Sequence, residues 1–101
     1  MVFIYTTCAS MDEARKLGKL IIDQKIAACV DMWPIQSMYN WKDKFEDHEG
    51  AMLLVTTLEA KLQDIDALIS ENHSYSTPLV AGVDVRRVNP EYREWLVNQI
   101  I

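Results

Sequence analysis

A histidine in a short polar stretch is the residue of this chain best suited to bind a metal ion. His73 stands between Asn72 and Ser74, after a run of apolar residues at helical spacing. An imidazole is neutral near pH 7, and its nitrogens suit copper or zinc. A second interpretation is a solvated histidine just past a helix end, where a cation favours the helix dipole. Binding through this histidine alone would be weak.

The two cysteines are the other candidate ligands for a metal ion. Cys8 lies just beyond the first expected strand, where we expect it to be the more accessible thiol. Cys29 lies in a strand of small residues, where a thiol is most often buried and inert. Two cysteines are too few for a disulfide framework, and their separation does not match a CxxC metal motif. We therefore expect both thiols to be reduced.

Three further groups of residues have both a functional and a structural interpretation. His48, between Asp47 and Glu49, could bind a cation weakly or lie in a solvated loop. The Arg86-Arg87 pair could bind an anion or provide solvated charge at a strand end. Four aromatic residues could line a ligand pocket between subunits or pack in a core or interface. They are Tyr39, Trp41, Tyr75 and Trp95.

Catalytic motifs are absent from the sequence, which predicts a protein that is not an enzyme. There is no Ser-His-Asp set, no HExxH, no nucleotide-type loop among the three glycines and no convincing pair of acid-base carboxylates. The net charge of -5 works against nucleic-acid binding. No apolar run approaches the roughly 18 residues of a membrane span, and the first residues do not resemble a secretory signal. We therefore expect a cytoplasmic protein without a nucleic-acid or membrane partner.

The chain is long enough for one compact core, so we expect a single domain over residues 1–101. Ser10 and Glu13 form a capping box, in which the carboxylate is expected to reach the Ser10 amide. Thr57 can cap a second helix, and Asn89 followed by proline can open a third. Residues 42–50 are charged and end in glycine, which favours an exposed connection. The expected strands are 2–7, 27–41 with an interruption at Pro34, 51–57 and 78–85, and the expected helices are 10–25, 58–69 and 89–99.

This order of elements predicts an α+β fold, a ferredoxin-like βαββαβ sandwich with an additional C-terminal helix. Right-handed crossovers place both long helices on one face of a four-stranded antiparallel sheet. The other face is left bare, with apolar residues such as Trp33 and Met38, and the long second strand has an unpaired edge. We therefore expect the protein to form homo-oligomers.

Five segments spread over the whole chain follow one known pattern. They are Tyr5-Thr6-Thr7, Lys25 to Val30, Ile35 to Trp41, His73 to Pro78, and Asn89 to Tyr92 with Trp95-Leu96. In these segments the chain resembles the CutA divalent-cation-tolerance family. The resemblance implies a single CutA-like domain and a homotrimer, in which the long hairpin of one subunit adds to the sheet of the next. It also implies a role in tolerance to divalent metal ions, copper above all.

The resemblance also bears on the candidate ligands. His73 matches the family histidine that is linked to metal. Some relatives have a metal-linked cysteine at the position of Thr6, and side chains two apart on a strand share a face. Cys8 could therefore substitute for that cysteine if the first strand continues to position 8. Cys29 remains a third candidate ligand.

Several positions depart from the family pattern, two of them at carboxylates. Lys42 and Leu79 each replace a glutamate that could have bound a cation or oriented a ligand. Ser74 replaces the proline of the family's His-Pro-Tyr. The remaining departures lie in the hairpin and are Asn40 and Asp43.

Two functions from different classes follow from these observations. The first is a CutA-like homotrimer for copper tolerance, which binds a divalent metal ion weakly through His73 with a nearby thiol. The alternative is a regulatory module, similar to the trimeric PII-type signalling proteins, with a small metabolite or anion between subunits. In that case the cations at Arg86-Arg87, or at Lys42 and Lys44, would bind the ligand.

Overall fold

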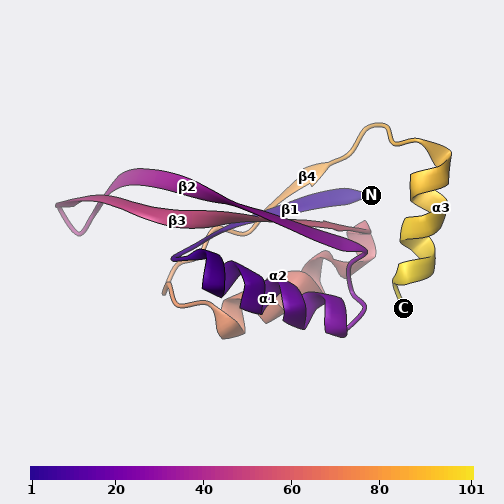
Figure 1. Ribbon diagram of the computed structural model, residues 1–101, viewed down its shortest axis with the longest axis horizontal. Helices are drawn as coiled ribbons and strands as arrows, with labels where there is room; N and C mark the ends of the chain where they lie inside the picture. Colours follow the sequence, from indigo (N-terminus) through magenta and orange to yellow (C-terminus); the bar gives the residue numbers. More distant parts are fainter.

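The structure, a computed structural model that describes residues 1–101, consists of a sheet layer and a helix layer. Four strands form one antiparallel sheet, in the order β2 (Cys29–Trp41), β3 (Lys44–Thr57), β1 (Val2–Cys8) and β4 (Ala81–Asp84). Helices α1 (Met11–Asp23) and α2 (Leu62–Asn72) cover one face of the sheet, and α3 (Pro90–Gln99) lies apart at the C-terminal end (Figure 1). This arrangement confirms the predicted ferredoxin-like fold with an additional helix.

Alternate residues of β1 point into the space between the sheet and the helices. The odd-numbered residues between them are only half-buried, which is the period of two expected for a strand with one covered face. Helix α1 contributes its predicted apolar stripe, including Leu17 and Ile21, to the same core. Cys8 is therefore the last residue of the strand and part of the core. The buried β1 residues are Val2, Ile4, Thr6 and Cys8, each at most 1% exposed.

The start of α1 confirms the predicted cap at Ser10, with one difference. The Ser10 hydroxyl accepts a hydrogen bond from the Glu13 amide at 3.1 Å. The Glu13 carboxylate was expected to return to the Ser10 amide, but it accepts from the Ala9 amide at 2.8 Å instead. The carboxylate thereby lies beside the end of β1.

The predicted connection over residues 42–50 is wrong, because most of it belongs to β3. Only Lys42 and Asp43 form the turn, and both have positive φ angles, 51° and 64°. Two such residues suit the right-handed twist of a two-residue hairpin. The far halves of β2 and β3 pair with each other beyond the end of β1, whose last partner in β3 is Ala51. They form the long arm at the left of Figure 1.

The predicted interruption at Pro34 is also wrong, since β2 is continuous through this residue, which pairs with Ala51. Strand β2 lies at the edge of the sheet, where only alternate amides bond the neighbouring strand. A proline is therefore tolerated in the middle of this strand.

Two other predicted boundaries and the predicted side-chain cap of the last helix differ in the structure. Thr57 is no helix cap; it is fully buried at the end of β3, and its hydroxyl donates to the Ile26 carbonyl at 2.6 Å. A 3-10 turn (Glu59–Lys61) precedes α2, which begins at Leu62 without a side-chain cap. Strand β4 is shorter than predicted, because it pairs only with residues 2–5 of β1. Asn89 precedes α3, but its side chain bonds Glu91 and makes no cap.

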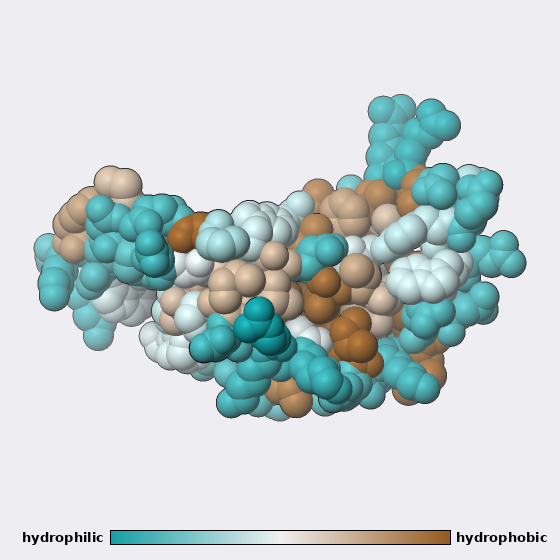
Figure 2. Space-filling model, in the orientation of Figure 1, coloured by the Kyte–Doolittle hydropathy of each residue, from teal (hydrophilic) through white to brown (hydrophobic).

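The sheet face opposite the helices carries exposed apolar side chains, as predicted. Trp33 is 40% exposed and Val83 is 48% exposed. The prediction was wrong for Met38: it pairs with Asp47, which has the same parity as the buried Ala51, so Met38 lies on the other face of the sheet. In Figure 2, apolar surface runs along the middle of the molecule, whereas the tip of the long hairpin is mostly hydrophilic. No helix of the structure is long and apolar enough to cross a bilayer.

Candidate metal centre

Three side chains from three separate elements meet at one end of the sheet. Cys8 ends β1, Glu13 lies in the first turn of α1, and His73 is the residue that follows α2. One ligand atom from each of them lies within 4.8 Å of the other two. The structure thus brings together two of the three predicted ligands, Cys8 and His73, and adds Glu13. Strand β1 continues through Cys8, as the substitution of Cys8 for a cysteine at position 6 requires.

His73 is held by two backbone groups. Its imidazole is fully buried, so the interpretation as a solvated residue is wrong. The Nε2 atom lies 2.8 Å from the Thr7 carbonyl oxygen, which can only accept, so Nε2 carries the proton. The Nδ1 atom accepts a hydrogen bond from the Tyr75 amide at 3.0 Å. His73 is therefore a neutral imidazole, and its Nδ1 atom lies 4.0 Å from Glu13 Oε1.

Glu13 is bound by backbone amides on both sides of the cluster. Its Oε1 accepts from the Ala9 amide at 2.8 Å, and its Oε2 accepts from the Ser74 amide at 2.9 Å. Burial raises the pKa of this carboxyl. Hydrogen bonds from Ser74 and Ala9 oppose that effect and bring the pKa below its ordinary value. Glu13 is thus an ionised carboxylate at neutral pH.

Cys8 is a protonated thiol at neutral pH. Burial, and then the negative charge of Glu13, raises its pKa to about 11. A metal ion that binds Cys8 must therefore displace the thiol proton. The Thr6 hydroxyl, on the same face of β1, is fully buried and has no hydrogen-bond partner. This buried oxygen, on the same face as Cys8, could still form a hydrogen bond to a further polar group.

Cys29 lies far from this cluster. Cys29 pairs with Thr56 near the end of β3, whereas Cys8 pairs with Ala51, five positions back along the same strand. Its Sγ atom lies 3.7 Å from the Asp31 carboxylate. Burial and the nearby Asp31 raise the pKa of this thiol. Cys29 and His73 therefore cannot share one ion.

The other candidates from the sequence also lie outside the cluster. His48 lies in β3, not in a loop, and its Nε2 is 2.8 Å from the Tyr39 hydroxyl. Its Nδ1 is 3.0 Å from the Glu49 carbonyl. Arg86 and Arg87 follow β4, are exposed and form no ion pair. The structure therefore groups none of them with Cys8 and His73.

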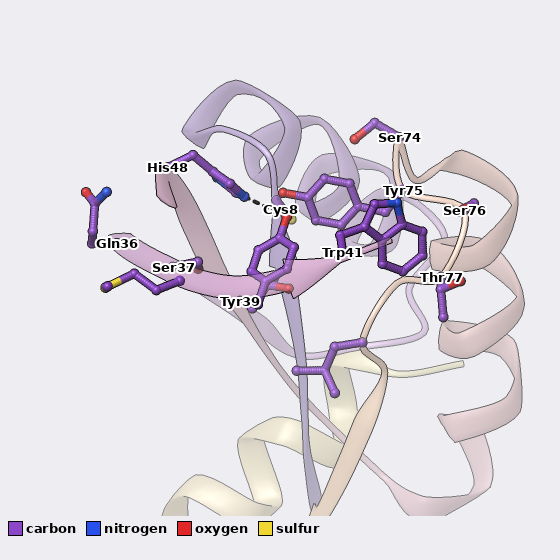
Figure 3. Close-up of a pocket in the computed structure, with 13 residues that line it drawn as sticks. Cys8, Gln36, Ser37, Tyr39, Trp41, His48, Ser74, Tyr75, Ser76 and Thr77 are labelled. Atoms are coloured by element: carbon purple, nitrogen blue, oxygen red, sulfur yellow. Dashed lines mark hydrogen bonds between the residues drawn. The ribbon is translucent and has the colours of Figure 1, made fainter. Parts of the chain in front are cut away.

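An open cavity of about 750 Å³ adjoins the cluster. Cys8 lies on its wall, Tyr39, Trp41 and His48 of the hairpin form one side, and residues 74–77 form another (Figure 3). No Lys or Arg side chain lines it. The cavity therefore offers no cation to an anionic ligand, and the PII-like alternative is not favoured.

Sequence reasoning missed Glu13 as a functional residue, because it accounted for the carboxylate by the capping box alone. The bond from the Ser74 amide joins residues 61 positions apart, which no local pattern indicates. The one sequence signal for Glu13 was its position shortly after the first strand. A glutamate that caps a helix shortly after a strand lies near the last residue of that strand, here Cys8, and near the neighbours of that residue.

Comparisons with known proteins agree in family and fold. The family model described as CutA1 divalent ion tolerance protein matches residues 2–99. The Divalent-cation tolerance protein CutA of Archaeoglobus fulgidus is 32% identical over 94 residues, which span 93% of this chain and 92% of that protein. The crystal structure of CutA1 from Pyrococcus horikoshii has a TM-score of 0.96 and 27% identity, and covers 100% of this chain and 99% of that chain. CutA1 from Oryza sativa has a TM-score of 0.94 and 31% identity, covering 99% and 93%.

Proposed function

Because the chain belongs to the CutA1 family of divalent ion tolerance proteins, we propose that it acts by binding a divalent metal ion at Cys8, Glu13 and His73. The observation that carries this proposal is the convergence of a thiol, a carboxylate and an imidazole within 4.8 Å. The three donors come from β1, α1 and the end of α2, so the fold itself brings them together.

The donor set fits copper or zinc better than magnesium or calcium. Thiolate and imidazole are ligands for the softer metals, whereas hard cations take oxygen ligands only. Among divalent first-row metals, copper binds such a site most strongly. The unpaired Thr6 hydroxyl lies on the same buried face and is consistent with a polar occupant. We propose copper as the preferred metal.

Binding at this site is expected to be weak. The Cys8 thiol must lose its proton, and its pKa is about 11. Both His73 nitrogens already have hydrogen-bond partners within the chain. These hydrogen bonds provide partners for His73 from within the chain, so we expect that metal is not required for folding.

A calorimetric copper(II) titration with a matched pair of histidine variants tests the site. His73→Gln keeps an amide donor and acceptor for the two backbone partners but removes the imidazole ligand. We expect it to weaken copper binding by at least about tenfold, since lost supporting contacts alone have that effect. His48→Gln removes the other histidine and should bind as the unaltered chain does. Equal affinities in all three proteins would contradict the proposed role of His73.

Cys29 stays a separate prediction, because it lies at the other end of the sheet. With Asp31 as its neighbour it provides two donors. Loss of copper binding in Cys29→Ser, with binding retained in Cys8→Ser, would move the proposed site to that end.

We further propose that the protein is a homotrimer, assembled through the long hairpin and the open sheet edges. The bare sheet face, with its exposed Trp33 and Val83, supports burial against another copy. Light scattering at micromolar concentration is expected to give about three times the 11.6 kDa of the monomer. A mass near that of one chain would contradict assembly.

The location in the cell remains a prediction. The sequence predicts a cytoplasmic protein. One structural relative, from Archaeoglobus fulgidus, is described as periplasmic, and the Arabidopsis thaliana relative as chloroplastic. Fractionation of cells that express the chain, followed by detection with an antibody, tests the cytoplasmic location.

A further inference from the structure

The loop that follows α2 is held by the same atoms that would bind a metal ion. The Ser74 amide donates to Glu13 Oε2 at 2.9 Å, and the Tyr75 amide donates to His73 Nδ1 at 3.0 Å. These two bonds fix the start of the segment 74–77, which continues along one side of the cavity (Figure 3). Binding of a metal ion to these atoms would therefore affect the position of this loop.

The lone pairs of the two ligands decide which bond is affected. A carboxylate offers about four acceptor positions, so Glu13 can bind an ion and still accept from Ser74. An unprotonated imidazole nitrogen has a single lone pair. Since Nε2 of His73 donates to Thr7, the lone pair of Nδ1 is the one available to a metal, and the Tyr75 amide occupies it. The ion and this amide are direct competitors.

The Tyr75 side chain connects the cluster with the long hairpin. Its ring lies 4.9 Å from the His73 ring, centroid to centroid. Burial, and then the nearby Tyr39, raises the pKa of its hydroxyl. Tyr75 and Trp41 both line the cavity, one from the loop and one from β2 (Figure 3). A shift of Tyr75 would therefore change the cavity wall that faces the hairpin.

We propose that a metal ion displaces the Tyr75 amide from His73 Nδ1, and that this releases the segment 74–77 and reshapes the cavity. The inference rests on the proposed metal site and adds a structural consequence of metal binding there. Binding of an ion to the buried ligands at the end of β1 would thereby change the shape of the cavity wall. The device is a competition between one amide and one ion for one lone pair.

Amide hydrogen exchange, followed at single residues with and without saturating zinc(II), tests this inference. Zinc uses the same ligands and undergoes no redox reaction with the thiol. We expect the Tyr75 amide to exchange at least about tenfold faster with zinc, as loss of a hydrogen bond predicts. A ligand that merely stabilises the fold slows exchange, so the expected change has the opposite sign. His48→Gln should show the same acceleration, and His73→Gln should show none.

The outcomes separate the inference from the metal site itself. Zinc that binds through His73 in calorimetry, yet leaves Tyr75 protected, would overturn the inference and leave the proposed function standing. Absence of zinc binding would contradict both the proposed metal site and this inference.

A second measurement checks the cavity. In Trp33→Phe/Trp95→Phe, Trp41 is the single tryptophan, and zinc should shift its emission. Unchanged emission at saturation would overturn the claim that the cavity is reshaped.

Discussion

Gly50→Ala is expected to lower the free energy of unfolding by about 3 kcal/mol, at the upper end of the usual cost of overpacking. A Cβ atom at this position would lie 2.5 Å from the Cys8 carbonyl oxygen. The obstacle is backbone, and it belongs to a strand paired with β3 in register from Val2 to Cys8. A side chain could rotate away from such a contact, whereas the strand must shift. Urea denaturation followed by circular dichroism measures the loss.

Gly18→Ala is the matched control for this prediction. A Cβ atom there would lie 3.0 Å from Cγ2 of Val30, the far end of a side chain. Alanine also gains up to about 1 kcal/mol of helix propensity over glycine inside α1. We expect its stability to stay within about 1 kcal/mol of the unaltered chain. If Gly50→Ala were as stable as Gly18→Ala, the close approach of β3 to the end of β1 would be wrong.

Metal affinity is expected to rise about 100-fold between about pH 7 and about pH 9, because each bound ion displaces one proton. The proton comes from Cys8, whose raised pKa of about 11 keeps the thiol protonated throughout this range. His73 is a neutral imidazole and Glu13 has a lowered pKa, so neither contributes a proton there. Competition for zinc(II) against a chelator of known affinity at each pH measures the change.

Cys8→Ser supplies the control for the pH dependence. A serine hydroxyl does not ionise in this range, so the affinity of the variant should stay nearly constant. Cys29→Ser should keep the full dependence, since Cys29 lies at the other end of the sheet. An affinity of the unaltered chain that does not change with pH would show that the thiolate of Cys8 is no ligand.

The order of the elements was readable from the sequence where local signals and core burial agree. Strand β1 alternates buried and half-buried residues over its whole length. The Ser10 cap begins α1, and the proline after Asn89 begins α3. Each of these signals depends on residues close together in the chain, and the structure keeps all three elements.

The outer half of β3 was not readable, because it has no buried face, whereas the facing strand over residues 35–41 was predicted. Residues 44–49 are charged or exposed for most of their length, so they show no apolar period of two. The turn consists of Lys42 and Asp43, which lack the Asn-Gly or Asp-Gly signature of such turns. Pairing with β2 provides the hydrogen bonds that place this segment in the sheet.

The candidate site was predicted residue by residue but not as a group. His73 and Cys8 were recognised by their chemistry, yet their proximity depends on α2 ending beside the end of β1. The same chemistry led to Cys29, which the strand register places at the opposite end of the sheet. Glu13 joined the group only through its long-range bond to Ser74. Side-chain type indicates a ligand, whereas topology decides which ligands meet.

A cobalt(II) titration tests the proposed site most directly, since cobalt bound by a thiolate shows a sulfur-to-metal charge-transfer band in the near ultraviolet. We expect this band for the unaltered chain and for Cys29→Ser, and its loss in Cys8→Ser. A band that persists in Cys8→Ser, or no band in the unaltered chain, would contradict binding of a metal ion by Cys8, Glu13 and His73.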